Sequence, residues 1–426
     1  MLKEEKNKLL SEAIKATRSK RALQLCKTFK FKVNKSSLSK EQKESLKMFF
    51  IEAKRTYNYI LNDINNGADL FNYDYKKLNH ITYYDKDKNL IEYTNTHIKT
   101  SVIQEIIANM RDSIKGLSSS KKNGNKVGSL KFKSECNSIK LKQYGVTHSI
   151  KGNRIKIQGI KKPIRVGGLK QLDKYTNIDF TTANILYDGY DYYISLTCFI
   201  GFIDKENTKK EYKNNIIGID LGCRSTITLS NGEKIKVSIE ESERLKGLQN
   251  KLRSCKKRSN NWYKTQSKLR KEYNKMTNRK NDLSNKLVHY LISNNEIIVA
   301  QDDPINCWKE KDELSKTIHH SILGRLKSRL NRYDNVIFLD NWFPTTQHCF
   351  NCGHDTKTDL NKTTFICKKC GLKEDRDVHA ANNMIEFYNR YIQSVGTIDL
   401  KPRVKISYNT YKNLCRQEAQ LSSAAE

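Results

Sequence analysis

Residues 216–222 have the sequence IIGIDLG, an apolar run that carries one acidic side chain, Asp220. A short run rich in β-branched residues is typical of a buried strand. A carboxylate at the end of such a strand is costly unless it meets a cation or hydrogen-bond donors. The segment therefore predicts a buried strand whose terminal aspartate has a chemical role.

Two later segments place acids in comparable positions. The run IIVAQDD predicts a second buried strand, which ends in Asp302 and Asp303. For Asp302 an ordinary cap, turn or surface role is expected. In the run EDRDVHAANNM, Asp375 and Asp377 stand where the last predicted helix begins.

Three carboxylates from two strand ends and one helix can converge on a pair of Mg²⁺ ions about 4 Å apart, as a two-metal nuclease requires. Carboxylate oxygens are ligands that suit Mg²⁺. Each acid taken alone also fits a helix cap, a turn or a surface charge. The order strand, strand, helix favours a shared Mg²⁺ site formed by Asp220, an acid after the second strand and an acid at the start of the last helix.

The cysteines indicate a second kind of metal site. Cys349-x-x-Cys352 and Cys367-x-x-Cys370 are separated by 14 residues, and a glycine follows each pair. Two such turns bring four thiolates into a tetrahedron around Zn²⁺, and this closed shell leaves no open position for catalysis. We therefore predict a structural zinc whose binding contributes to folding. Two histidines beside the pairs are expected to be exposed and not to be ligands: His348 and His354.

The chain between these motifs alternates predicted strands and helices. Strands are expected at residues 226–229 and 336–339, and a helix at about residues 319–330. Residues 240–290 predict a long helical hairpin with many lysines and arginines. A solvated pair of charged helices would explain this pattern, but the excess of positive charge favours a hairpin that lies against nucleic acid.

The N-terminal half predicts a strand-rich module interrupted by helices. Phe29, Phe31 and Val33 alternate with lysines, as in a half-buried strand. Two helical runs follow, and residues 116–128 predict a flexible basic loop. Further strands are expected at four places: residues 129–132, 139–141 and 154–157, and a hairpin that turns at Asp188-Gly189.

The composition limits the classes of protein that fit. The formal net charge of +33 is spread along all 426 residues, which favours a polyanionic partner such as nucleic acid over a membrane surface. The sequence contains no run of about 20 apolar residues that could span a membrane. The charged N-terminus lacks a secretory signal, so we expect a cytoplasmic protein. The seven cysteines outside the two pairs indicate ordinary reduced thiols.

Together these motifs resemble the C-terminal half of TnpB proteins, which compact type V CRISPR effectors share. The resemblance covers about residues 214–385 and depends on an ordered set of segments: GIDLG, QDD, FPTTQHCFNCG, the second cysteine pair and DRDVHAANNM. The N-terminal half is similar only in layout, like the wedge and recognition modules of those families. The resemblance implies an α+β multidomain fold. A β-barrel-like wedge with a helical recognition insertion would precede an RNase H-like (RuvC) α/β domain that contains an OrfB-type zinc ribbon.

The resemblance also implies domain boundaries. They are a basic helical extension at 1–24, a wedge strand at 25–37, a helical recognition insertion at 38–116, a wedge β module at 117–203, a RuvC-like domain at 204–345 with its basic hairpin at 240–290, a zinc ribbon at 346–374, the final RuvC-like helix at 375–395 and a C-terminal tail at 396–426.

The function implied by the resemblance is RNA-guided cleavage of DNA. Asp220 and Asp377 would be the first and third RuvC carboxylates, with Mg²⁺ as the catalytic cofactor and Zn²⁺ as the structural one. The family normally has a glutamate after the second strand, and Asp303 at this position reaches about 1.5 Å less far. A misplacement of about this size can reduce a rate about 10²-fold.

The implied partners are a guide RNA and target double-stranded DNA, and both a monomer and a homodimer on one RNA stay open. The principal alternative is an RNA-guided DNA-binding repressor that no longer cuts. A transposon strand transferase would need a recombinase tyrosine or serine site, which the sequence does not distinguish from background. The sequence leaves open whether a transposon or a CRISPR array supplies the guide.

Overall fold

The computed structural model describes residues 3–85, 89–201, 215–308, 312–357, 362–396 and 404–415. The chain forms two compact units, Met1–Asn207 and Thr208–Glu426. Both units mix helices and sheets, so the fold is α+β, as predicted. Residues 204–213, at the start of the RuvC-like domain implied by the resemblance, lie outside the described residues.

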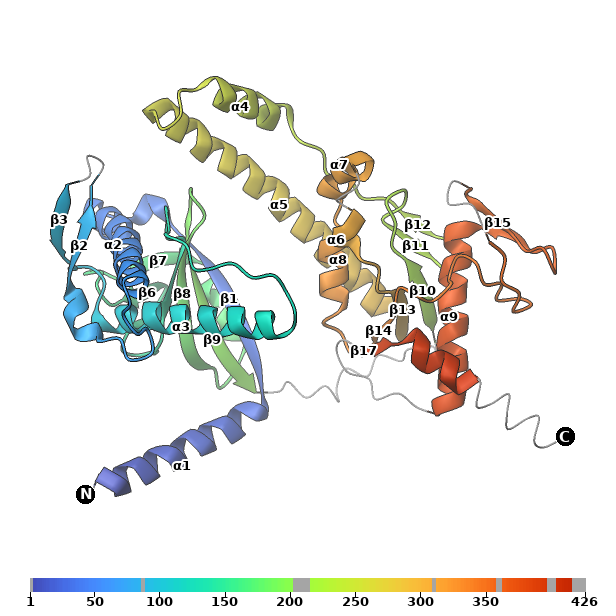
Figure 1. Ribbon diagram of the computed structural model, residues 1–426, viewed down its shortest axis with the longest axis horizontal. Coiled ribbons are helices and arrows are strands. Elements are labelled where there is room, and N and C mark those ends of the chain that lie inside the picture. Colours follow the sequence, from blue (N-terminus) through green and yellow to red (C-terminus); the bar gives the residue numbers. More distant parts are fainter. Residues whose placement is uncertain are drawn as a thin grey trace. The chain divides into compact units, whose positions relative to one another are not determined.

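A curved, barrel-like sheet forms the centre of the first unit (Figure 1). Its strand order is β4-β8-β9-β1-β7-β6-β5. The long strand β1 pairs along most of its length with β9 and at its end with β7. The strands are β1 (Gln24–Val33), β4 (Ser138–Leu141), β5 (His148–Lys151), β6 (Arg154–Ile157), β7 (Ile164–Gly167), β8 (Asp179–Tyr187) and β9 (Tyr192–Gly201).

Two long helices, α2 (Lys40–Asn65) and α3 (Thr100–Lys122), pack their apolar stripes into the same core as the sheet. A capping box fixes the start of α2, because Ser39 and Gln42 each bond the backbone N–H of the other. A small hairpin of β2 (His80–Tyr84) and β3 (Leu90–Thr94) lies between the helices in the chain. The basic helix α1 (Lys3–Ala22) precedes β1.

Two predictions for this unit were wrong. Residues 116–122 are helical, because α3 continues past Gly116 until Lys122. The serines and lysines there are compatible with a helix whose apolar residues have already anchored it. The predicted strand at residues 129–132 is irregular chain instead. The hairpin β2–β3 was not predicted within the helical insertion.

The second unit is built on a six-stranded sheet with the order β12-β11-β10-β13-β14-β17. The strands β10, β13, β14 and β17 run parallel, whereas β11 and β12 are antiparallel to their neighbours. Their bounds are β10 (Ile216–Asp220), β11 (Ile227–Leu229), β12 (Lys234–Ile235), β13 (Ile297–Gln301), β14 (Val336–Leu339) and β17 (Val404–Ile406). The predicted strands at 216–222, 226–229, 297–300 and 336–339 are therefore confirmed.

Helices cover both faces of this sheet. One face packs against the end of α5 (Asn260–Asn294) and against α8 (Leu323–Leu330). The other face packs against α9 (Arg376–Val395). The predicted hairpin is confirmed as α4 (Glu243–Ser254) and α5, and the predicted last helix as α9. Two short helices, α6 (Ile305–Trp308) and α7 (Asp312–His320), complete the unit.

Two details of this unit differ from the predictions. The helix expected at residues 319–330 is interrupted, because α7 ends at His320 and α8 begins at Leu323. Residues 404–406, predicted as part of a tail, form the edge strand β17, and residues 408–415 are helical. Within the described residues, no helix is long and apolar enough to cross a membrane.

Candidate active site and metal centre

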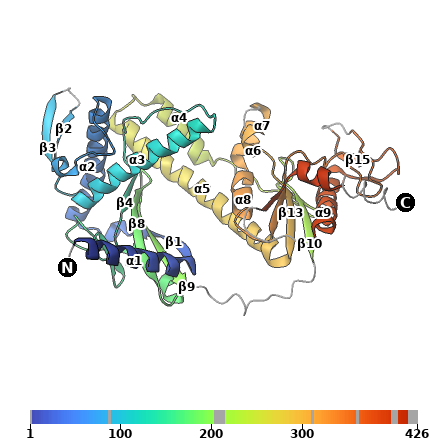
Figure 2. The same cartoon turned by 60° about the horizontal axis from the view of Figure 1, so that its bottom comes forward.

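Asp220 lies at the end of β10, on the sheet face that α9 covers. Gly218 precedes it by two residues and therefore shares this face. A Cβ atom at Gly218 would come within 1.9 Å of the Ala381 carbonyl oxygen, so the glycine lets α9 lie directly on the strand (Figure 2). Asp377 is one helical turn before Ala381, and it therefore approaches the end of β10.

Asp303 follows β13, the parallel neighbour of β10. Ile219 of β10 is opposite Ala300 of β13, so both strands end at the same edge of the sheet. Asp303 comes two residues after Gln301, whose buried side chain bonds the backbone beyond β14. The carboxyl ends of parallel strands therefore place Asp303 at the edge that carries Asp220.

The first turn of α9 supplies two acids with different environments. Asp375 is the N-cap, and its carboxylate accepts from the backbone N–H groups of Asp377 and Val378. Lys234 of β12 also pairs with Asp375 at 2.7 Å. Burial alone would raise the pKa of Asp375, but these hydrogen bonds hold it below its usual range. The Asp375 carboxylate therefore serves as the N-cap of α9. The Asp377 carboxylate instead contacts the Arg376 guanidinium at 3.2 Å.

Asp220 is close enough to Asp377 and Asp303 for their charges to affect its pKa. Burial, followed by the charges of Asp377 and Asp303, raises the pKa of Asp220 to about 7. Burial raises the pKa of Asp303 to about 6, although Lys327 opposes this shift. Carboxylates that disfavour one another's charge are typical of a site that is completed by a cation.

The three carboxylates are near one another but not yet within one ligand shell. Among the described residues, the oxygens of Asp220, Asp303 and Asp377 do not all lie within 4.8 Å of one another. The neighbouring Asp302 points elsewhere and pairs with Lys327 at 2.5 Å and with Lys405 at 2.6 Å. These ion pairs agree with the structural role that the sequence predicted for Asp302.

The four predicted cysteine ligands form one cluster. All four Sγ atoms lie within 4.8 Å of one another, with Cys349 and Cys370 separated by 3.6 Å and Cys352 and Cys367 by 3.5 Å. A tetrahedron with Zn–S bonds of about 2.3 Å has edges of about 3.8 Å, so the cluster has the dimensions of a zinc site. Gly353 and Gly371 follow the pairs, and both have positive φ.

Backbone N–H groups favour thiolates on one side of the cluster. The N–H of Cys370 is the main cause that lowers the pKa of Cys367 to about 6. Burial raises the pKa of Cys349 to about 12, so a fully deprotonated cluster needs a cation. Both conditions suit Zn²⁺, and the cluster could hold this ion.

Two buried histidines connect this cysteine module to α9, and sequence reasoning missed both roles. His379, in the second turn of α9, stacks on Phe365 with ring centroids 3.6 Å apart. Its Nε2 also lies 2.7 Å from the carbonyl oxygen of His348. The expectation that His348 is exposed was wrong, because it is buried and contacts Asp355 at 2.7 Å. The sequence signal for His379 was its position two residues after Asp377, near the start of the predicted helix.

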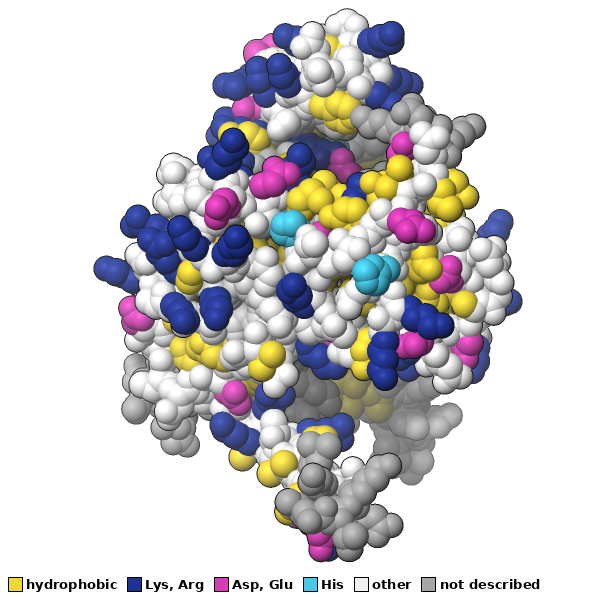
Figure 3. All heavy atoms as spheres, turned by 90° about the vertical axis from the view of Figure 1, so that its left-hand side faces the viewer, with side chains coloured by type: hydrophobic (Ala, Val, Ile, Leu, Met, Phe, Trp, Pro, Cys, Tyr) yellow, Lys and Arg dark blue, Asp and Glu magenta, His cyan; other side chains and the backbone are white. Residues whose placement is uncertain are grey.

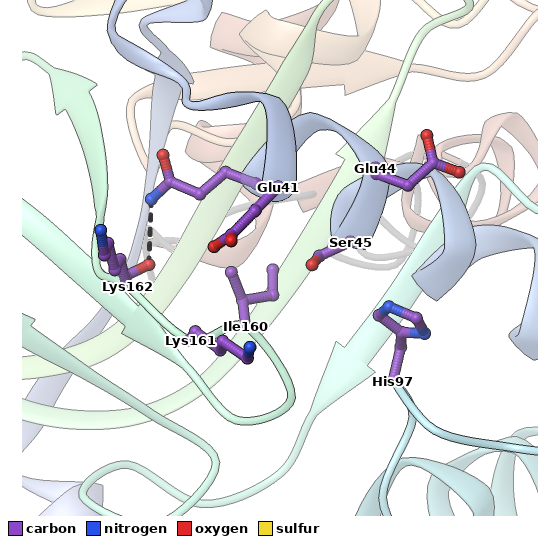
Figure 4. A pocket seen from close by; sticks show the side chains of 8 residues that line it. Glu41, Glu44, Ser45, His97, Ile160, Lys161 and Lys162 are labelled. Atoms are coloured by element: carbon purple, nitrogen blue, oxygen red, sulfur yellow. Dashed lines mark hydrogen bonds between the residues drawn. The ribbon is translucent and has the colours of Figure 1, made fainter.

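The first unit has a separate hollow of about 310 Å³ (Figure 4). Its lining includes His97, Ser45 and two lysines, Lys161 and Lys162. Buried Glu52 holds the His97 ring at 2.9 Å and accepts further backbone N–H bonds, so its pKa is lowered although burial opposes this shift. None of the predicted site residues lines this hollow.

Comparison with known proteins agrees with the geometry of the second unit. The family OrfB_IS605, described as "Probable transposase", matches residues 202–302. The family described as "Cas12f1-like, TNB domain" matches residues 319–384, which include all four cysteines and Asp377. The predicted resemblance to TnpB proteins and compact type V effectors is therefore confirmed.

The relatives that match this chain carry related names. A Streptomyces pristinaespiralis protein named "Putative RNA-guided DNA endonuclease" is 31% identical over 178 residues, which are 40% of this chain and 44% of the relative. The Escherichia coli protein "Putative RNA-guided DNA endonuclease InsQ" is 26% identical over 40% of this chain and 48% of its own length. The matches thus span less than half of these relatives.

A solved structure is weakly similar to most of the chain. It is the cryo-EM structure of a Cas12f1–sgRNA–target DNA complex, with a TM-score of 0.42 and 11% identity over 85% of this chain and 98% of the other.

Proposed function

We propose that this protein is an RNA-guided DNA endonuclease that cleaves DNA complementary to a bound guide RNA. The observation that supports this proposal most is the pKa of Asp220, which burial and the acids Asp377 and Asp303 raise to about 7. The adjacency of β10 and β13 in the sheet, and the packing of α9 on Gly218 of β10, also support it. Such a sheet is what an RNase H-like (RuvC) domain requires.

Asp220, Asp303 and Asp377 would hold Mg²⁺, which when bound activates water and stabilises the charge that develops on the phosphodiester. The chain positions these ligands through rigid elements, because α9 packs directly on Gly218 of β10. Lys327 donates to the Asp303 carbonyl oxygen at 2.5 Å and fixes the backbone beside that carboxylate.

The four-cysteine module would be a structural zinc ribbon inserted between β14 and α9. Its role would be to support the first turns of α9, because Phe365 and His348 contact His379 there. Loss of the zinc would therefore disturb Asp377, which is two residues from His379. Under this proposal, the domain boundaries implied by the resemblance apply to the chain with two changes: α3 extends the helical insertion to Lys122, and residues 404–406 join the RuvC-like sheet as β17.

Positive charge would hold the guide RNA and its heteroduplex with DNA. Lysines and arginines are spread over the face of the molecule seen in Figure 3. On the solvent side of β1, Lys30 lies 4.2 Å from the centre of the Tyr193 ring. Trp262 and Tyr263 at the start of α5 pack edge to face, and Tyr263 is exposed for stacking on a base. Tyr57 is buried in the core, so it packs and does not stack.

Base pairing would read most of the target sequence, whereas the protein would read a short flanking motif. This division of labour needs no large base-specific surface on the protein. It agrees with a charge of +33 that is spread along the chain.

One observation favours a second candidate, a repressor that binds DNA under RNA guidance without cutting it. Among the described residues, the carboxylates of Asp220, Asp303 and Asp377 do not form a closed ligand set. The Asp303 side chain is also shorter than the glutamate of related proteins. This candidate shares every binding feature of the nuclease. Only the chemistry at Asp303 separates the two.

A cleavage assay with the RNA that copurifies with the protein tests the proposal. That RNA is sequenced, and the complex is incubated with matched plasmid and Mg²⁺. We expect cleavage by the wild type and by Asp282→Asn, which changes an exposed acid of α5 that pairs with Lys286. Asp220→Asn and Asp377→Asn are expected to bind the plasmid but to lose cleavage at least about 10²-fold.

Asp303→Glu separates the two candidates. We expect it to retain or increase cleavage, because the longer side chain reaches farther toward the other two acids. Binding without cleavage by both the wild type and Asp303→Glu would establish the repressor and exclude the nuclease. Copurification without a defined RNA, and with no guided binding, would exclude both.

A further inference from the structure

A third cluster of metal-binding side chains lies in the second unit, apart from the cysteines and the three acids. Glu241, His319 and His320 each offer one ligand atom, and these atoms lie within 4.8 Å of one another. The pair His319 Nε2 and Glu241 Oε1 is 4.0 Å apart. We propose that these three residues bind a divalent first-row transition ion such as Zn²⁺, with water completing the shell.

The donor set fits this class of ion. Two imidazoles and one carboxylate are typical ligands of Zn²⁺ and its neighbours, whereas Mg²⁺ and Ca²⁺ prefer oxygen alone. Ligand atoms about 2.0–2.1 Å from one ion are about 3.3 Å apart in a tetrahedron. A small rotation of the His319 side chain, which is 54% exposed, closes the 4.0 Å separation to this value.

The backbone of the site is fixed by the fold. Ile239 lies two residues before Glu241, and Ile318 directly precedes His319. Both isoleucines belong to the same buried core. The Ile239 N–H also donates to the His320 carbonyl oxygen at 3.0 Å. The two segments are 78 residues apart in the sequence, and these contacts hold them side by side at the base of α4 (Figure 1).

The carboxylate of the site is oriented by a second layer of polar groups. Gln249 of α4 donates to Glu241 Oε1 at 3.2 Å and to the hydroxyl of Tyr273 at 2.8 Å. Such outer partners hold metal ligands in place and typically change metal affinity by 10- to 100-fold when they are removed.

The hollow beside these ligands is open to water and carries charges of both signs. It measures about 650 Å³, and its charged lining includes Glu240, Glu241, Lys246 and Lys316. Lys280 donates to the His319 carbonyl oxygen beside it, so the two acids are the groups that would favour a cation here. A bound ion would join the start of the basic hairpin to the end of α7.

Cobalt titration of the full-length protein tests the site, after its cysteine cluster has been loaded with Zn²⁺ and with excess Mg²⁺ present to occupy the three acids. We expect one further equivalent of Co²⁺ to bind with weak absorption bands and without the intense sulfur-to-cobalt bands of a thiolate site. His319→Ala, His320→Ala and Glu241→Gln should each weaken this second equivalent at least tenfold, and Gln249→Ala about tenfold. His289→Ala, which changes an exposed histidine of α5, is the matched control and should leave it unchanged.

Hydrogen exchange gives an independent readout. Added Co²⁺ should protect the amides of residues 239–241 and 318–320 in the wild type but not in His319→Ala. Three results would overturn the proposal: no saturable second equivalent, an affinity that His319→Ala and Gln249→Ala leave unchanged, or thiolate bands on cobalt addition. These outcomes do not depend on cleavage, so they are separate from the test of the nuclease.

Discussion

At the scale of single residues, Asp220 has the most informative chemistry. Its folded-state pKa of about 7 lies above the value of about 3.9 for an ordinary aspartate. The folded protein therefore holds a proton that the unfolded chain releases between about pH 4 and pH 7. The free energy of unfolding falls as the pH rises through this window, because ionisation is favoured in the unfolded chain.

Asp220→Asn should therefore stabilise the protein when Mg²⁺ is absent. At pH 8 we expect the free energy of unfolding to rise by up to about 4 kcal/mol, because each pKa unit corresponds to about 1.4 kcal/mol. The difference should vanish below about pH 3, where the wild-type carboxylate is protonated in both states. Urea denaturation at both pH values measures it, with Asp282→Asn as the control.

Mg²⁺ should make the wild type more stable than Asp220→Asn, which reverses the order expected without the ion. An ion that binds the folded wild type adds stability by mass action, whereas Asp220→Asn loses a ligand and should gain less. A wild type that Mg²⁺ leaves unchanged at pH 8 would argue against a cation at these acids.

The close contact between Gly218 and α9 leads to a second prediction at the residue scale. A methyl group there would meet the Ala381 carbonyl oxygen at 1.9 Å, so α9 and β10 would have to separate. We expect Gly218→Ala to lower the free energy of unfolding by about 3 kcal/mol and to reduce cleavage, because Asp377 moves with α9. The matched control is Gly247→Ala, since Gly247 lies on exposed α4 with open space around its Cα.

Thermal or urea unfolding of both variants decides this prediction. Gly247→Ala should stabilise the protein by up to about 1 kcal/mol, because alanine favours the helix. Equal effects of the two substitutions would show that the close approach of α9 and β10 is not needed.

At the scale of elements, the cysteine module and α9 act together. His379 of α9 stacks on Phe365 of the module, and its ring also contacts the His348 carbonyl oxygen. Removal of zinc should therefore increase amide exchange in residues 346–357 and at the start of α9, and it should reduce cleavage even after Mg²⁺ is restored. Cys370→Ser is expected to reproduce this loss.

Cys307→Ser is the matched control, because Cys307 is an exposed free cysteine outside the cluster. It should leave the zinc content, measured by elemental analysis, and the exchange at α9 unchanged. A zinc-free protein with normal exchange at α9 would contradict the coupling.

The sequence predicted elements well where one short pattern decides the structure. The apolar runs before Asp220 and Asp303 predicted β10 and β13, and the cysteine spacing predicted the cluster. The sequence failed to predict elements whose structure depends on contacts between residues far apart in the chain. Residues 404–406 become β17 only because they pair with β14, and α3 continues through Gly116 because its earlier turns are buried. The cluster of Glu241 with His319 and His320 could not be predicted from the sequence either, because the core brings together segments that are far apart in the chain.

At the scale of the whole molecule, the charge of +33 leads to the last prediction. Binding of RNA that neutralises phosphates releases counterions, so the logarithm of affinity falls linearly with the logarithm of salt concentration. If the basic hairpin contacts RNA, removal of its exposed lysines should weaken binding and flatten this slope. Three exposed positions near the tip of the hairpin suit the test: Lys256, Lys257 and Lys264.

The triple change of these lysines to glutamine should flatten the slope by about 0.7 for each lost contact with single-stranded RNA, or about 0.9 for a duplex. Binding isotherms of the purified protein with its guide RNA at several salt concentrations measure it. A matched triple, Lys8→Gln, Lys15→Gln and Arg18→Gln on exposed positions of α1, removes the same charge from another element. If both triples flatten the slope equally, only total charge matters, and the hairpin has no special place in RNA binding. A larger effect of the hairpin triple would locate the RNA on α4 and α5, because net charge is identical in the two variants.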